Sequence, residues 1–291
     1  MKAVFNIRCG RRILNLNKRP YIMGILNVTP DSFSDGGHYL TINSSVECAR
    51  RMAEEGADII DIGGESSRPG AEPVPLEVEL ERVIPVIKKL SDKIDILISI
   101  DTYKAKVAKE ALKAGASIIN DISGLRFDPM MAKIAAEAGC PVIIMHMKGT
   151  PRDMQRRPAY KDVVKEITAF FKERIAFAVK NGIKRNKIII DPGIGFGKTV
   201  RHNLEIIKRL KEFRKLGVPI LIGPSRKSFI GRILNEPVDK RLEGTAAVVA
   251  ISIANGANIV RVHDVKAMAD VAKITDAINK SKRWYWKASL I

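Results

Sequence analysis

Cysteine is scarce in this chain, which has three in 291 residues. Cys9, Cys48 and Cys140 are odd in number and far apart, so they do not form the framework of a disulfide-stabilised secreted protein. We interpret them as reduced thiols and expect a cytoplasmic protein. No apolar run approaches the roughly 18 residues of a membrane-spanning helix, and Met1-Lys2-Ala3 opens no signal peptide. We therefore expect no membrane partner.

Metal-binding and nucleophilic patterns are also missing. The chain has four histidines, no two of which have the spacing of a zinc site, and no cysteine accompanies them. No nucleophile and base stand out as a pair either. These absences argue against a transition-metal centre and against a nucleophile supplied by the protein.

Acidic residues are too few to balance the basic ones. The chain has 50 Lys and Arg against 32 Asp and Glu, a formal net charge of +18. Such a surplus is found in proteins that bind nucleic acids or membrane surfaces. Here, however, the basic residues are spread over helix-like segments beside acidic ones, and the clusters at 8–12 and 280–287 carry no RNA-binding signature. We interpret the charge as a solvated surface and expect no nucleic-acid partner.

One short phrase occurs three times in the chain. It reads Gly-Ala-Asp-Ile-Ile-Asp at 56–61, Gly-Ala-Ser-Ile-Ile-Asn at 115–120 and Gly-Ala-Asn-Ile-Val-Arg at 256–261. Each copy follows a helix-like segment. Glycine suits the left-handed turn that ends a helix, and an uninterrupted apolar run is typical of a buried parallel strand. The polar last residue would lie at the carboxyl end of the strand, where α/β sheets and barrels collect their chemistry.

Such apolar segments number eight, and helix-like segments alternate with them. The alternation predicts an α/β fold, a (β/α)8 TIM barrel over about residues 20–280, within one domain spanning 1–291. A doubly wound open sheet remains the alternative, because alternation does not prove closure. Residues 2–18 predict an N-terminal β-hairpin that closes the N-terminal end of the barrel. The apolar segments end at Leu26, Ile62, Ile100, Ile119, Met145, Ile190, Ile222 and Val262, and the helix-like ranges are 44–55, 76–90, 104–114, 130–138, 162–181, 203–216, 242–255 and 265–279.

Three of the expected strands end on hydrogen-bond acceptors, Asp101, Asn120 and Asp191. They would project into one mouth, and two carboxylates with an amide suit the N–H groups of an amidine-like heterocycle. The alternative is helix capping, in which Asp101-Thr102 and Asp121 would each cap the helix that follows. Capping explains any one of these residues equally well, but it explains three at the same depth less well.

Basic and hydroxyl side chains follow other strands and suit an anion. Residues 63–70 combine adjacent glycines, two serines and Arg68, although a structural bend is the alternative. Residues 223–228 place two hydroxyls and two cations at the start of a helix. Arg261 and His263 alternate on one strand, and both would be costly inside a barrel unless they bind an anion or a carboxylate.

The loop over 27–37 is longer than a tight strand-to-helix turn needs. It carries Asn27, two aspartates that include Asp35, and one apolar anchor, Phe33. These residues suit a hard cation or a lid over a substrate, against the alternative of an Asx-rich turn. We interpret the loop as a functional lid.

The glycine-rich segment 193–199 differs from a phosphate-binding P-loop, because Pro192 stands where that template needs a glycine. We interpret it as a loop that presents Phe196. Together, acceptors for a heterocycle and cations for an anion predict a transfer between two substrates with an anionic leaving group.

Eight segments resemble the signature motifs of the dihydropteroate synthase family, in the expected order over about residues 20–280. The resemblance implies a (β/α)8 barrel, a homodimer, and the joining of para-aminobenzoate to dihydropterin pyrophosphate by an SN1-like displacement that releases diphosphate, with Mg²⁺ as cofactor. It also implies a target of sulfonamides. The segments are Ile22–Gly37, Asp61–Gly70, Ser99–Thr102, Ile119–Asp121, Met145–Pro151, Asp191–Lys198, Ser225–Gly231 and Arg261–Asp264.

The resemblance also implies roles for individual residues. One departure is Ser67, where the family usually has threonine. The implied catalytic residues are Asp35, Arg68, Lys227, Arg261 and His263. The implied contacts are Asp101, Asn120, Asp191 and Lys227 for the pterin; Asn27 with Mg²⁺, Arg68, Arg261 and His263 for the diphosphate; and Phe33, Ser67, Pro69, Phe196 and Ser228 for para-aminobenzoate.

Two other functions compete with this one. A pterin-dependent methyltransferase would share the barrel and the acceptors, but it would not need the 27–37 lid or the hydroxyls and cations of 225–228. A non-catalytic protein that binds pterin or nucleic acid is suggested by the net charge of +18.

Overall fold

The structure is a computed structural model that describes residues 5–10, 12–29 and 38–281, except for the side chains of residues 38–41. Within this part, eight strands run parallel: β3 (Tyr21–Asn27), β4 (Ile59–Gly63), β5 (Leu97–Asp101), β6 (Ile118–Asp121), β7 (Val142–Met145), β8 (Ile188–Asp191), β9 (Leu221–Ile222) and β10 (Ile259–Val262). Their order in the sheet is β8-β7-β6-β5-β4-β3-β10-β9, and a bridge between Ile190 and Ile220 brings the two edges together. The predicted barrel is confirmed, and the open-sheet alternative is wrong.

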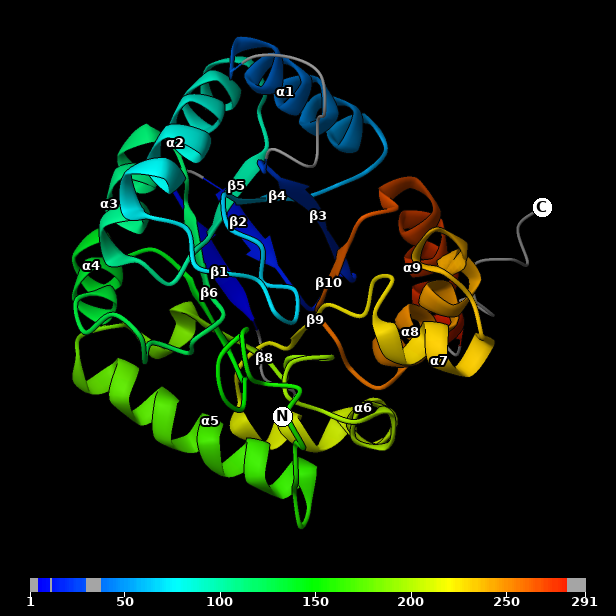
Figure 1. Cartoon of the computed structure of the whole chain (residues 1–291). Coiled ribbons are helices and arrows are strands. Elements are labelled where there is room, and N and C mark those ends of the chain that lie inside the picture. The colour runs from blue at the N-terminus through cyan, green and yellow to red at the C-terminus, as the bar shows by residue number, and fades with distance from the viewer. Residues whose placement is uncertain (1–4, 11, 30–37, 282–291) are drawn as a thin grey trace.

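Helices form the outer layer around the strands (Figure 1). Each expected helical range overlaps an observed helix, and the short helix α7 is additional. None of the described helices is long and apolar enough to cross a membrane. The helices are α1 (His38–Glu54), α2 (Leu76–Lys93), α3 (Ala105–Ala114), α4 (Met131–Ala138), α5 (Val163–Lys180), α6 (Val200–Lys208), α7 (Ser228–Leu234), α8 (Leu242–Ala254) and α9 (Val265–Lys280), with short 3-10 helices η2 (Arg185–Lys187), η3 (Leu210–Leu216) and η4 (Val238–Lys240).

The single helix expected over 203–216 is wrong. The α-helix ends at Lys208, and the rest of the range is the 3-10 helix η3. In η3, Leu210, Phe213 and Leu216 are buried at a spacing of three, which is the period of a 3-10 helix. Because a spacing of three also fits one face of an α-helix, the apolar pattern alone does not separate the two.

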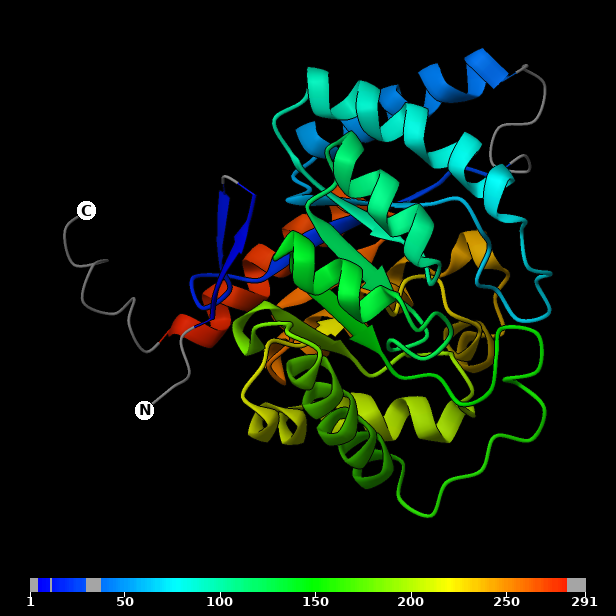
Figure 2. The ribbon, with the colours of Figure 1, turned by 90° about the vertical axis from the view of Figure 1, so that its left-hand side faces the viewer.

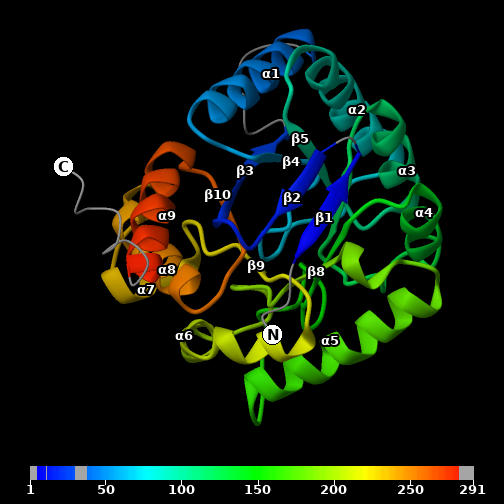
Figure 3. The same cartoon turned by 180° about the vertical axis from the view of Figure 1, so that it is seen from behind.

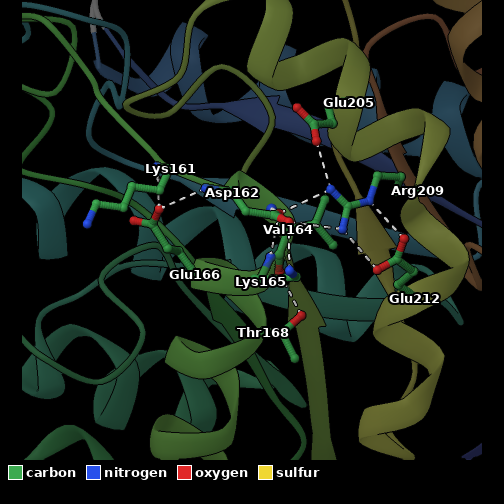
Figure 4. A network of polar contacts seen from close by, with 9 residues as sticks. All are labelled: Lys161, Asp162, Val164, Lys165, Glu166, Thr168, Glu205, Arg209 and Glu212. Carbon is green, nitrogen blue, oxygen red and sulfur yellow. Dashed lines mark hydrogen bonds and ion pairs between the residues drawn. The ribbon is translucent and has the colours of Figure 1, made fainter.

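Arg209 lies at the junction of α6 and η3 and binds three carboxylates (Figure 4). It donates to Glu205 at 2.7 Å, to Glu212 at 2.8 Å and to Asp162 at 3.1 Å. Asp162 in turn caps α5, where its side chain accepts two backbone N–H groups. One guanidinium therefore ties the end of α6 to the start of α5.

The three repeated glycines end helices as predicted. Gly56, Gly115 and Gly256 follow α1, α3 and α8, and their φ angles are 104°, 120° and 102°. At Gly115 a side chain would also meet Ser91, whose Cβ lies 2.4 Å from the place of an added Cβ. The turn between helix and strand therefore needs glycine at this position for two separate reasons.

The N-terminal hairpin, β1 (Asn6–Cys9) paired with β2 (Arg12–Asn15), closes one end of the barrel as predicted. Figures 2 and 3 show it against the end of the barrel at which the strands begin. Its buried side chains pack on the first residues of the strands. The cluster consists of Ile7, Cys9, Leu14 and Leu16 with Met23, Ile59, Leu97, Ile118, Ile143, Ile189, Leu221 and Ile259.

Candidate active site

A buried network of charged and amide side chains lies at the carboxyl ends of four strands. Arg261 of β10 donates through Nε to Asp61 Oδ2 at 2.6 Å and through Nη2 to Asp101 Oδ2 at 2.7 Å. Asn120 Nδ2 donates to the same Asp61 oxygen at 2.9 Å. The other oxygen of Asp61, Oδ1, is buried without a hydrogen-bond partner among the described residues. The network therefore keeps an acceptor free for a ligand.

Sequence reasoning missed Asp61 as a site residue, although it lies at the centre of this network. Its side chain is fully buried in the apolar strand β4. A signal was present, since Asp61 ends the first copy of the repeated phrase just as Asn120 and Arg261 end the other two. The last residues of all three copies meet in the structure.

Burial and charge set the protonation of this network. Burial raises the pKa of Asp101 to about 7; Arg261 opposes the rise and the Asp61 carboxylate adds to it. The pKa of Arg261 is raised as well, because the two carboxylates outweigh the effect of its burial. Arg261 is thus a permanent cation between two carboxyl groups, one of which titrates near neutral pH.

Helix capping does not explain Asp101. The N-cap position of α3 is Lys104, without a side-chain cap, and the N–H of Ala105 is bound by Asp128 instead. Asp121 binds the N–H groups of Ser123 and Leu125, which lie in the turn before α4. The capping alternative is therefore wrong for both aspartates, and Asp121 anchors a loop.

Asp191, Lys227 and Phe196 lie near one another at the mouth, where the charges of Asp191 and Lys227 affect each other and Lys227 contacts Phe196. Asp191 accepts the N–H of Gly193 at 2.7 Å, and burial raises its pKa to about 6. Burial lowers the pKa of Lys227 to about 8, with nearby Arg261 adding to the effect and Asp191 opposing it. Lys227 Nζ lies 4.2 Å from the centroid of the Phe196 ring, a cation–π distance. Phe196 itself is buried, so its presentation to a substrate stays a prediction.

In segment 223–228, fewer hydroxyl and cationic groups are free to bind an anion than the sequence suggests. Arg226 donates twice to the Asp264 carboxylate, at 3.0 and 2.5 Å, and Ser225 is bound to His263. Lys227 and the exposed Ser228, the first residue of α7, remain. Both predicted cations lie at this helix start, but Arg226 is paired with Asp264, so its use for an anion stays a prediction.

His263 is a neutral side chain near pH 7. Burial, followed by the charges of Arg261 and Arg226, lowers its pKa to about 4. His263 lies beside Arg261, but it can contact an anion only as a neutral hydrogen-bonding group and not as a cation.

The loop between β4 and α2 carries Ser67, which is half-buried, and Arg68 and Pro69, which are exposed. Gly64 in this loop is packed for structural reasons, since an added Cβ would lie 2.8 Å from Val83. Its carbonyl accepts a hydrogen bond from Arg82. The structural reading of the paired glycines therefore holds for Gly64.

Asn27 lies half-buried at the end of β3, paired in register with Gly63. The lid residues Phe33 and Asp35 lie outside the described residues. Among the residues that are described, no group of three His, Cys, Asp or Glu side chains is arranged to hold a metal ion.

Lys198 explains why 193–199 is not a phosphate loop. Its Nζ is buried and lies 2.8 Å from the carbonyl of Phe196 and 3.1 Å from Nδ1 of His146. The lysine of a P-loop reaches out to phosphates, whereas this one is held inside the protein.

The chain resembles a family of known proteins along most of its length. The family described as pterin binding enzyme matches residues 23–263. A relative named dihydropteroate synthase, from Synechocystis sp., is 50% identical over 270 residues, which cover 92% of this chain and 93% of the relative.

Solved structures are similar as well. The Yersinia pestis dihydropteroate synthase in complex with a sulfonamide drug has a TM-score of 0.90 and 44% identity, and the match covers 94% of this chain and 99% of that one. The Xanthomonas albilineans dihydropteroate synthase in complex with 7,8-dihydropteroate has a TM-score of 0.85 and 42% identity, covering 94% and 98%.

Proposed function

From the premise that this chain belongs to the dihydropteroate synthase family of pterin-binding enzymes, we propose that it condenses 6-hydroxymethyl-7,8-dihydropterin pyrophosphate with para-aminobenzoate. The products are 7,8-dihydropteroate and diphosphate. Beyond the relationship itself, the observation that carries this proposal is the buried network of Asp61, Asp101, Asn120 and Arg261 at the mouth of the barrel. Its free acceptor oxygens match the N–H groups along one edge of a pterin ring.

The pterin would be held by Asp101, Asn120, Asp191 and Lys227. Carboxylate and amide oxygens accept its ring and amino N–H groups, and Lys227 donates to an acceptor atom of the ring. Lys227 lies close enough to Asp191 for their charges to affect each other. The buried Asp61, which sequence reasoning did not include, belongs to the same subsite.

In the proposed reaction the bond between the pterin methylene carbon and the diphosphate oxygen breaks first. The bonding electrons leave with the diphosphate, and the carbocation is stabilised by the carboxylates around the ring. The amino nitrogen of para-aminobenzoate then forms the new C–N bond and loses a proton to water. The nucleophile is a substrate, which accounts for the missing nucleophile–base pair.

The diphosphate would be bound by Arg68, Arg261 and His263, with Asn27 as a protein ligand of Mg²⁺. Magnesium prefers oxygen ligands and usually combines one or two side chains with waters and substrate phosphates, so a single amide oxygen at the end of β3 fits it. When bound, the ion neutralises charge on the leaving diphosphate. Arg261 already has two carboxylate partners, so Arg68 carries more of the cationic contact.

Para-aminobenzoate would contact Ser67, Pro69, Phe196 and Ser228, together with Phe33 and Asp35 from outside the described residues. Phe196 supports this role because it is packed among Met145, Met147 and Met154 with Lys227 over its ring. An aromatic carboxylate would meet an apolar wall and a cation at this place.

We also propose a cytoplasmic homodimer without membrane or nucleic-acid partners, in which residues 1–291 form one domain. Exposed apolar side chains on neighbouring elements at the outside of the barrel support the dimer, because a second copy would bury them. They are Leu204 on α6, Ile233 and Leu234 on α7, Val238 on η4 and Ile251 on α8.

The proposed activity is tested by measuring diphosphate release with both substrates and Mg²⁺. We expect release that depends on para-aminobenzoate and equals the dihydropteroate formed. Binding of the pterin substrate without release would support a non-catalytic binding protein instead. A pterin-dependent methyltransferase would release no diphosphate at all.

A further inference from the structure

Ser225 contacts His263 in two ways. The serine lies in the loop between β9 and α7 and is 4% exposed. Its Oγ accepts a hydrogen bond from the backbone N–H of His263 at 3.2 Å and lies 2.9 Å from Nδ1 of the same residue. One hydroxyl therefore holds both the backbone and the ring of His263.

These two contacts determine the direction of the hydroxyl hydrogen. A serine hydroxyl has one hydrogen to donate. Among the described residues, His263 Nδ1 is the only acceptor within hydrogen-bonding distance of Ser225 Oγ. A buried hydroxyl hydrogen without an acceptor is costly, so Ser225 donates to Nδ1. A proton on Nδ1 would place two donors on Oγ and leave the serine hydrogen without a partner.

We propose that Ser225 is a positioning residue that holds His263 as the neutral imidazole with its proton on Nε2. The remaining N–H then donates to the departing diphosphate, a role that rests on the proposed function. A neutral imidazole is a very weak acid, so it stabilises the oxyanion without giving up its proton.

The charged groups around His263 favour the same state. Arg261, Arg226 and Lys227 are cations close to the ring, and the nearby carboxylate of Asp264 is bound by Arg226. An imidazolium would be repelled by three cations and would lose the hydrogen bond from Ser225. The cationic contacts to the leaving group therefore come from arginine and lysine, and His263 supplies a directional donor.

The tautomer is measured directly by long-range ¹H–¹⁵N NMR of the full chain labelled with ¹⁵N-histidine, with the His263 signals assigned from the His263→Gln variant. We expect a protonated Nε2 and an unprotonated Nδ1 from pH 6 to 8. In Ser225→Ala, a fraction with Nδ1 protonated should appear. A matched control is Ser252→Ala, since Ser252 is a buried serine on α8 whose hydroxyl has no hydrogen-bond partner among the described residues. It should leave the His263 signals unchanged.

Kinetics provide the second readout. Ser225→Ala should lower kcat/KM for the pterin pyrophosphate about tenfold, by the loss of one oriented donor, while KM for para-aminobenzoate stays unchanged. His263→Gln places an amide N–H near the position of Nε2 and should retain at least tenfold more activity than His263→Asn, whose amide matches Nδ1.

Two results would overturn the proposal. One is a proton on Nδ1 in the unaltered protein; the other is an unchanged tautomer in Ser225→Ala. Equal losses in His263→Gln and His263→Asn would contradict the role as a neutral donor. If the unaltered protein has no synthase activity, the proposed function fails, whereas the NMR result still decides the role of Ser225.

Discussion

Arg261 Nε lies 2.6 Å from Asp61 Oδ2, although 200 positions separate the two residues in the chain. Asp61 ends the first copy of the repeated phrase, Arg261 ends the third, and Asn120, which ends the second, donates to the same oxygen. The repeat places a polar residue at the same depth on β4, β6 and β10. Because the sheet is nearly closed, the three side chains at this depth meet inside the barrel.

Asp61→Asn should lower the free energy of unfolding by about 3 kcal/mol, because removing one partner of a buried ion pair leaves a poorly compensated charge. The loss should lie near the lower end of the usual range, since Arg261 keeps Asp101. Urea unfolding followed by circular dichroism measures it. Asp95→Asn is the control: its pair with Arg12 is exposed, so the change should stay below about 1 kcal/mol. Equal losses in both variants would contradict a structural role for the buried network.

Asp101→Asn should weaken binding of the pterin pyrophosphate by one to two decades. The substitution turns an acceptor into a donor that faces a ring N–H, and an unpaired buried group costs about 1–3 kcal/mol. Isothermal titration calorimetry of the unaltered and variant proteins compares the affinities. Unchanged affinity would remove Asp101 from the pterin subsite.

The same variant should alter how stability depends on pH. The Asp101 carboxyl has a pKa of about 7 in the folded protein, against an ordinary value of 3.8, so the folded protein keeps this proton where the unfolded chain has lost it. Its contribution to stability is therefore complete below about pH 4 and is lost as the pH rises through 7. Asp101→Asn should flatten the fall in unfolding free energy between pH 4.5 and 7.5, measured by urea titrations across this range. Asp191 and Asp121 have raised pKa values of about 6 and should preserve part of the slope.

Arg261→Ala and His263→Ala should have non-additive effects on kcat/KM if both residues contact one diphosphate. Groups that share a ligand typically show a coupling of about 0.5–3 kcal/mol in a double-mutant cycle. Arg261→Ala should in addition destabilise the fold, because it removes the ion pairs of Asp61 and Asp101, and His263→Ala should do so much less. Fully additive kinetic losses would indicate separate tasks.

Para-aminobenzoate should bind measurably only after the pterin pyrophosphate, or pterin with diphosphate, is present with Mg²⁺. Arg68 and Pro69 are exposed on the loop between β4 and α2, so ordering this part of the proposed subsite costs conformational entropy that the first substrate offsets. Titration of para-aminobenzoate into the bare protein tests the order. Equal affinity with and without the first substrate would show that the subsite exists beforehand.

The barrel was predictable because its signals are local. Glycines such as Gly115, with the apolar runs after them, mark three of the helix ends and the strands that follow, and the hairpin alternates around Gly10. Acceptors at strand ends were predictable for the same reason, since Asp101 and Asn120 follow directly from strand register.

The sequence did not predict which side chains pair with one another at the mouth of the barrel. The sequence around Arg226 does not show that Asp264 neutralises it. The sequence around Arg261 does not show its two carboxylate partners either. These pairs depend on the distances between segments that are far apart in the chain. The 3-10 geometry of η3 was hidden because its apolar spacing fits two kinds of helix.

The hairpin packs Ile7 and Leu14 against the first residues of the strands, so the barrel is closed at that end. Among the described residues, the side chains proposed to bind the two reactants lie at the opposite end of the strands. A pterin bound deep in the barrel then has to enter before para-aminobenzoate. The product has to leave by the same end of the barrel. The order in which substrates bind and the route by which the product leaves therefore both follow from the closure of the opposite end by the hairpin.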